Sequence, residues 1–425
     1  MPSSRGATFA RETALLPDSC PVRGLCISPS NLTTVNSNSN LNLNSQPSIL
    51  TTSPHHTSKS PLLPPLSPTL TEMAYEYPPH ADHTVPLPSG PPLSVRIWPA
   101  SPSPSPPSPR PFLLWTHGGG FLAGSHFMPL YWLDIAFRHT HNYHLISHSY
   151  RLAPQASLDT QLADCLFVVR WLRGNLPSIL GAEAVDVDRY VLAGDSAGGL
   201  LVMLMGMRLG KGLNVDVPPR AIIDIYGGAD FVGSLELDRE GEGEEWKGEF
   251  SAEELEAYLD NRDEREVISE ALSWREMEEY SEEELSGYCK KEIRYTKRVR
   301  LQAELHVWRS LHPKGGELMI RATMHREKFG TEEEFDEFVR EMSPLRALRR
   351  VKEEGEREFP PTAFLHGTGD EAVPVQHSRE VAATLKGMGV PVVERYPEGE
   401  PHVFDRKYTV SLSLSCEVGL GETRC

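Results

Sequence analysis

The chain has 425 residues, enough for two to three domains or for one large domain with additions. Its 42 basic and 59 acidic residues give a formal net charge of -17, which argues against nucleic-acid binding as the main role. Hydrophobic residues make up only 39%, so we expect part of the chain to lie outside any packed core.

The cysteines and the N-terminus indicate where in the cell the protein is expected. The six cysteines show no metal-binding spacing, and we interpret them as reduced thiols. No apolar run is long enough to span a bilayer, and the N-terminus lacks the apolar segment of a secretory signal. We therefore expect a cytoplasmic protein without stable membrane insertion. Arg5, Arg11 and Arg23 leave a mitochondrial presequence as the alternative.

The N-terminal part of the chain consists of a polar stretch followed by the beginning of a folded domain. Residues 1–72 are rich in Ser, Asn, Pro and Thr and lack a persistent apolar period, which predicts a disordered tail. The first stretch typical of a folded domain begins at Met73. Residues 91–98 alternate weakly and predict a strand, and the Ser/Pro run at 101–109 predicts an exposed loop.

Two predicted strands then lead into distinctive loops. The apolar run 112–115 predicts a buried strand and is followed by HGGGF at 117–121. Three consecutive glycines let backbone N–H groups converge on one point, because no side chain blocks the approach. Residues 143–149 predict another strand, and YRLAP follows at 150–154.

A third strand ends in a glycine-flanked serine. The apolar run 190–194 predicts a buried strand, and Gly194, Ser196 and Gly198 form a G-x-S-x-G motif at its end. This spacing is typical of a sharp strand-to-helix turn, where a strained serine exposes its oxygen and glycines allow close backbone approach. Residues 200–209 predict the helix that follows.

Strands and helices alternate through this half of the chain. An amphipathic pattern at 158–172 predicts a helix that ends near Gly174, and residues 221–226 predict a further strand. Such alternation favours an α/β fold with a mostly parallel sheet and helices on both faces.

The segment from 111 to 227 resembles the hormone-sensitive-lipase-like branch of the α/β-hydrolase superfamily. The resemblance is carried by HGGGF at 117–121, YRLAP at 150–154 and GDSAGG at 194–199, which occur in the family's order and spacing. It implies an α/β-hydrolase fold and a serine hydrolase that cleaves small-molecule carboxylic esters through an acyl-enzyme, without a metal or organic cofactor.

The segment after residue 227 is dense in Glu, Arg and Lys. We interpret residues 228–359 as a mainly helical cap, inserted where this superfamily often carries a lid, with its charge runs on solvated helix faces. Four helix starts carry capping or N-terminal proline patterns: Ser251 with Glu254, Ser281 with Glu284, Thr331 with Glu334, and Ser343 before Pro344.

The hydrolase pattern resumes at residue 360. Residues 362–370 predict a strand that leads to Asp370, a helix follows at 377–386, and the strand predicted at 390–396 precedes His402. Ser196, Asp370 and His402 therefore stand in the nucleophile, acid, histidine order of α/β-hydrolases. His402 would accept the proton of Ser196, and Asp370 would hold the imidazole in the required tautomer.

The glycine loop would supply the oxyanion hole. The resemblance assigns the donors to the N–H groups of Gly119, Gly120 and Ala197, with Gly118 supporting the turn. We expect His117 to brace this loop rather than to take part in the chemistry.

The predicted organisation has five segments. A disordered tail (1–72) precedes the first part of the core (73–227), the cap (228–359), the second part of the core (360–405) and an atypical C-terminal tail (406–425). The family normally continues into an amphipathic helix after the histidine loop, whereas residues 408–415 alternate. We therefore expect a mobile His402 loop and weak turnover.

Three other functions fit the same motifs. An amidase or deformylase and an acyl transferase would use the same triad. A non-catalytic small-molecule receptor would use only the fold, as the gibberellin receptors that resemble this family do. Those receptors lack the catalytic histidine, whereas His402 is present here.

Overall fold

The structure is a computed structural model that describes residues 79–102, 108–127, 131–209, 217–231, 245–271, 296–355 and 358–407. Its centre is an eight-stranded sheet in the order β1-β2-β4-β3-β5-β6-β7-β8. The pairings β1–β2 and β2–β4 are antiparallel and all others are parallel, which confirms the predicted α/β fold. The strands are β1 (Ala81–Val85), β2 (Leu93–Trp98), β3 (Arg110–Thr116), β4 (His144–His148), β5 (Val185–Asp195), β6 (Ala221–Ile225), β7 (Thr362–Leu365) and β8 (Val392–Arg395).

Both faces of the sheet are covered. On one face the sheet shares a core with α2 (Leu158–Leu180), α3 (Ala197–Arg208), α12 (Pro344–Glu353) and α13 (Val375–Gly387). On the other face lie α1 (Tyr131–Leu133), the π-helical segment η3 (Asp134–Thr140) and the 3-10 turn η6 (Phe404–Lys407). β4 and β6 are buried along their whole length, and the apolar run at 190–194 of β5 is buried as predicted.

Helix α2 is longer than predicted. The expected end near Gly174 is wrong, because α2 continues through Gly174 and Pro177 to Leu180. An exposed glycine inside a helix costs only about 1 kcal/mol relative to alanine. Leu176 is fully buried, and burying such a side chain contributes about 1.5 to 3 kcal/mol. Burial of Leu176 therefore outweighs the glycine signal at Gly174.

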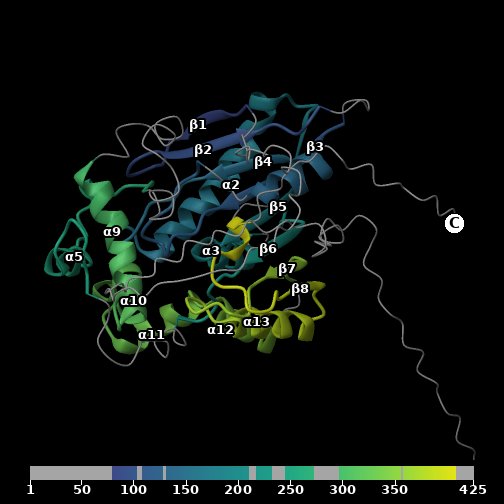
Figure 1. Cartoon of the computed structure of the whole chain (residues 1–425). Helices are drawn as coiled ribbons and strands as arrows, with labels where there is room; N and C mark the ends of the chain where they lie inside the picture. Colours follow the sequence, from purple (N-terminus) through teal and green to yellow (C-terminus); the bar gives the residue numbers. More distant parts are fainter. Residues whose placement is uncertain are drawn as a thin grey trace, which may run out of the picture.

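The segment between β6 and β7 contributes a group of helices to one side of the molecule (Figure 1). Part of it, with the loops after β3 and β4, forms a small apolar core of its own that includes Leu255, Leu305 and Leu318. The helical elements are α5 (Ala252–Tyr258), η4 (Glu264–Glu266), α9 (Lys297–Leu311), α10 (Gly315–Met324), η5 (Arg326–Lys328) and α11 (Glu332–Glu341), followed by α12.

The helix starts expected here are largely confirmed. Capping boxes are present at Ser251 and at Thr331, and Ser343 precedes α12 with a proline in its first turn. Ser281 lies outside the described residues, as do the predicted tail 1–72 and residues 408–425. No described helix combines the length and the apolar character that crossing a membrane requires.

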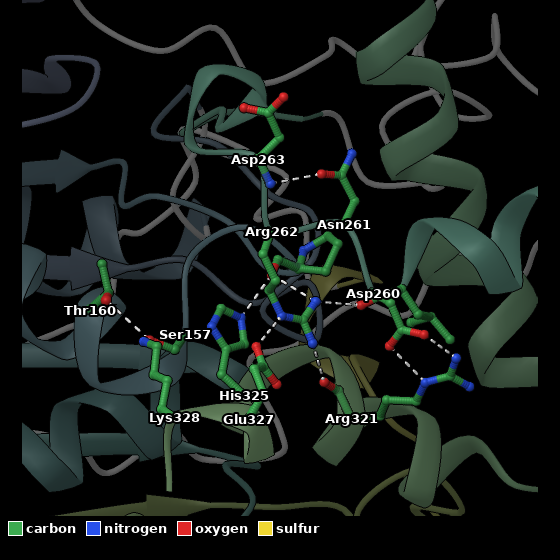
Figure 2. A network of polar contacts seen from close by, with 12 residues as sticks. Ser157, Thr160, Asp260, Asn261, Arg262, Asp263, Arg321, His325, Glu327 and Lys328 are labelled. Carbon is green, nitrogen blue, oxygen red and sulfur yellow. Dashed lines mark hydrogen bonds and ion pairs between the residues drawn. The ribbon is translucent and has the colours of Figure 1, made fainter.

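A polar network joins these helices to the loop that carries YRLAP (Figure 2). The carbonyl of Pro154 accepts hydrogen bonds from Arg262 Nη1 at 3.2 Å and from His325 Nε2 at 2.8 Å. Arg262 also donates to Glu327 Oε1 at 2.9 Å and to the carbonyl of Arg321 at 2.9 Å. Burial lowers the pKa of His325 to about 4, so its ring is neutral and acts as a single donor. Arg262 thus connects three separate segments of the chain.

We expect Arg262→Ala to lower the free energy of unfolding by about 1 to 3 kcal/mol, because it removes charge-assisted hydrogen bonds between segments. Urea denaturation measures the change. The matched control is Arg265→Ala, since that side chain is 89% exposed and pairs with Asp263 two residues away. Equal effects of the two substitutions would contradict the bridging role of Arg262.

Candidate active site

Ser196 lies at the turn between β5 and α3, in the middle of the sheet. Its backbone adopts φ 53° and ψ -117°, a left-handed conformation that non-glycine residues rarely adopt. The turn is close-packed: a Cβ atom on Gly198 would lie 2.0 Å from the carbonyl oxygen of Thr116, and one on Gly194 would lie 2.3 Å from that of Gly198. Only glycine fits at both positions, as the G-x-S-x-G spacing predicts.

The structure brings the three predicted triad residues together. His402 Nε2 lies 3.1 Å from Ser196 Oγ, and His402 Nδ1 lies 2.6 Å from Asp370 Oδ2. Their loops follow β5, β7 and β8, so all three side chains meet at the carboxyl edge of the parallel strands. A serine hydroxyl, an imidazole and a carboxylate in this order can activate an oxygen nucleophile.

Asp370 is buried but remains ionised. Burial alone would raise the pKa of its carboxyl group, but hydrogen bonds from His366 and His402 hold that pKa well below its usual value. The second oxygen accepts backbone N–H bonds from Ala372 at 2.9 Å and Val373 at 2.8 Å. A fixed carboxylate of this kind orients the imidazole of His402 with its other nitrogen toward Ser196.

The sequence interpretation missed His366, whose Nε2 lies 3.1 Å from Asp370 Oδ2. Its other ring nitrogen lies 2.8 Å from the hydroxyl of Ser378 on α13. The available signal was its position four residues before Asp370, at the end of β7.

The glycine loop after β3 lies directly beside Ser196. Gly119 (φ 102°) and Gly120 (φ 56°) both adopt the left-handed backbone that favours glycine. The N–H of Gly118 donates to Asp195 Oδ1 at 3.2 Å, so it braces the turn. Across the described ranges, no acceptor is found for the N–H groups of Gly119, Gly120 and Ala197. These three groups can therefore donate hydrogen bonds to an oxyanion.

The HGGGF and YRLAP motifs pack on each other. The His117 ring stacks on the Tyr150 ring with centroids 4.2 Å apart, and Tyr150 donates its hydroxyl hydrogen to the His117 carbonyl at 3.0 Å. Burial lowers the pKa of His117 to about 3, and its Nδ1 lies 2.8 Å from the Gly118 carbonyl. A neutral ring in this position supports the glycine loop.

The loop that carries His402 is held on its far side by Asp405. This buried carboxylate accepts hydrogen bonds from Trp132 Nε1 at 2.8 Å and from the Tyr226 hydroxyl at 2.7 Å. The Tyr226 ring also meets the His402 ring edge-on, with centroids 4.9 Å apart. No sequence signal marks these contacts, because the partners lie 273 and 179 positions away from Asp405.

A cavity of about 890 Å³ opens above Ser196. Its floor contains Gly119, Gly120, Ser196 and His402, and its walls include residues of α9 and α10. No group of side chains in the described ranges has a metal-binding arrangement. The size and lining of the cavity allow a small organic molecule to reach the serine between the sheet edge and these helices.

Two parts of the chain match known protein families. Residues 113–275 match a family described as alpha/beta hydrolase fold, and residues 314–413 match the prolyl oligopeptidase family. The first match contains Ser196 and the glycine loop, and the second contains Asp370 and His402.

Individual relatives match over shorter lengths. Probable carboxylesterase 3 of Arabidopsis thaliana is 33% identical over 104 residues, 24% of this chain and 32% of that protein. Neutral cholesterol ester hydrolase 1 of Mus musculus is 31% identical over 117 residues, 27% of this chain and 28% of that protein. The match thus spans about a third or less of each relative. Among solved structures, an esterase of Pyrobaculum calidifontis is 18% identical with a TM-score of 0.44, and the alignment covers 78% of each chain.

We expect Asp405→Ala to lower the free energy of unfolding by about 2 to 4 kcal/mol, because it removes the acceptor of two buried donors. Guanidinium denaturation measures the loss. Asp405→Asn keeps one carbonyl oxygen as an acceptor and should lower the free energy of unfolding by less. If both variants were as stable as the parent chain, the anchoring role of Asp405 would be wrong.

Proposed function

We propose that this chain, which belongs to the α/β-hydrolase superfamily, is a serine carboxylesterase that cleaves small-molecule esters through an acyl-enzyme. The observation that carries the proposal is the contact of His402 with both Ser196 and Asp370, at 3.1 and 2.6 Å, at the floor of the cavity. The N–H groups beside Ser196 support the same reaction.

In the proposed first half-reaction, Ser196 Oγ attacks the carbonyl carbon of the ester while His402 Nε2 takes the hydroxyl proton. The carbonyl oxygen becomes negative and accepts hydrogen bonds from Gly119, Gly120 and Ala197. One such donor contributes roughly 3 to 4 kcal/mol to the stability of the transition state. Collapse of the intermediate breaks the bond to the alcohol oxygen, which takes the proton from His402.

In the second half-reaction, water attacks the acyl group on Ser196 and gives one proton to His402. The acid leaves when the bond to Ser196 Oγ breaks, and His402 returns the proton to that oxygen. Asp370 stays ionised throughout, because its hydrogen bonds keep its pKa low. It stabilises the charged imidazole that forms in each step.

The alternatives use the same site differently. An amidase or deformylase would release an amine or formate, and an acyl transferase would pass the acyl group to another alcohol instead of water. The 3.1 Å contact of His402 with Ser196 favours a catalytic role over a receptor without chemistry. The cytoplasmic location, the absence of a cofactor and the absence of a nucleic-acid partner remain predictions.

We expect Ser196→Ala to lower kcat on p-nitrophenyl butyrate at least about 1,000-fold, since it removes the nucleophile. Release of p-nitrophenol and the melting temperature are measured on the same preparations. Ser310→Ala is the matched control, because Ser310 lines the same cavity and donates to a carbonyl of its own helix. Full activity in folded Ser196→Ala protein would overturn the assignment.

A further inference from the structure

A single arginine of α9 faces the catalytic cavity next to the glycine loop. Arg309 lines the cavity, and a Cβ atom on Gly120 would lie 3.1 Å from its Nη2 atom. The guanidinium group is therefore within a few ångströms of the backbone that would bind the oxyanion. It is half-buried, with its open side toward the cavity.

This guanidinium group has no carboxylate partner among the described residues. Its one hydrogen bond within those ranges runs from Nη1 to the Gly315 carbonyl at 3.4 Å, and its buried Nε has no acceptor there. Burial alone lowers the pKa of Arg309 to about 10, so the group is still charged at neutral pH. Asp230, an acidic residue that lines the same cavity, is paired with Arg346 at 2.7 Å.

Other arginines of the same helical segment behave differently. Arg300 pairs with Glu249, Arg321 with Asp260 and Arg326 with Glu332, all on exposed surfaces. A charge removed from water without a counter-charge is unfavourable, so it is rarely retained without a function. In a ligand cavity, such a group is a candidate for binding an ion of opposite charge.

His306, one helical turn before Arg309, adds a neutral donor. Burial, together with the charges of Arg309 and His402, lowers the pKa of His306 to about 3. Its buried Nδ1 has no partner in the described ranges, and a Cβ atom on Gly120 would lie 2.9 Å from it. The neutral ring can offer one N–H to a ligand that Arg309 attracts.

We propose that Arg309 binds a carboxylate group of the substrate, so that the preferred substrates are esters that also carry a free carboxylate close to the scissile bond. A planar guanidinium group matches the two oxygens of a carboxylate, and one unpaired cation matches its single charge. This inference rests on the proposed esterase function and narrows its substrate class.

The test compares monoethyl glutarate with its neutral amide analogue, ethyl 4-carbamoylbutanoate, which has nearly the same shape. We expect the parent chain to prefer the carboxylate ester by about 10- to 100-fold in kcat/KM, measured by titration of released acid. In Arg309→Met this ratio should fall to about 1, while Arg309→Lys should keep part of it. Arg300→Met on the same helix is the control and should keep the full ratio.

A second pair of esters shows where the carboxylate lies. The acetate ester of 4-hydroxybutyrate carries its charge on the alcohol side, and the acetate ester of 4-hydroxybutyramide is its neutral analogue. A preference that depends on Arg309 in either pair supports the proposal and assigns the side. Equal kcat/KM values for charged and neutral esters in the parent chain, or ratios unchanged in Arg309→Met, would overturn it.

Failure of the esterase function itself gives a different result. If none of these esters is hydrolysed, binding of monoethyl glutarate and of its amide to the intact chain is measured by calorimetry. If monoethyl glutarate binds more tightly than its amide, and Arg309→Met removes this difference in affinity, the anion site is supported even though the esterase proposal fails. Equal binding of the two compounds, or no binding of either, overturns the anion site as well.

Discussion

The site depends on the close packing of glycines that holds Ser196 in a left-handed backbone conformation. Gly194 and Gly198 have no room for a side chain, because backbone carbonyl groups occupy the positions where a Cβ atom would lie. The strain at Ser196 persists because β5 ends at the residue directly before it and α3 begins at the residue directly after it. The serine oxygen therefore projects from the sheet edge at one defined point, to which the acid, the histidine and the glycine loop are fitted.

The HGGGF and YRLAP motifs hold the backbone around the serine turn in place. The His117 ring stacks on the Tyr150 ring, which connects the glycine loop to the YRLAP loop. In the YRLAP loop, the Pro154 carbonyl accepts hydrogen bonds from Arg262 and His325 of the segment between β6 and β7. The insertion is thus coupled to the glycine loop through a continuous set of contacts. It also contributes Arg309 to the cavity wall, which is how a segment remote in sequence can influence which small molecule the cavity accepts.

Local patterns predicted most elements of the fold because their physical causes are local. Buried parallel strands read as apolar runs, and capping boxes at Ser251 and Thr331 mark helix starts within four residues. The prediction was wrong for α2, where a glycine signal was overridden by the burial of Leu176. It also missed β1, whose mostly exposed, polar sequence is paired with β2 at the sheet edge.

The sequence by itself determined the mostly parallel sheet, the strained serine turn and the identity of the three residues that meet above it. It could do so because strand-end loops of a parallel sheet converge at one edge, whatever the side chains around them. Only the tertiary structure decided that Asp405 anchors the loop of His402 and that Arg309 faces the cavity. Each of these depends on where a side chain points and on which groups remain unpaired after packing. Those properties are set by contacts between distant segments and leave no pattern along the chain.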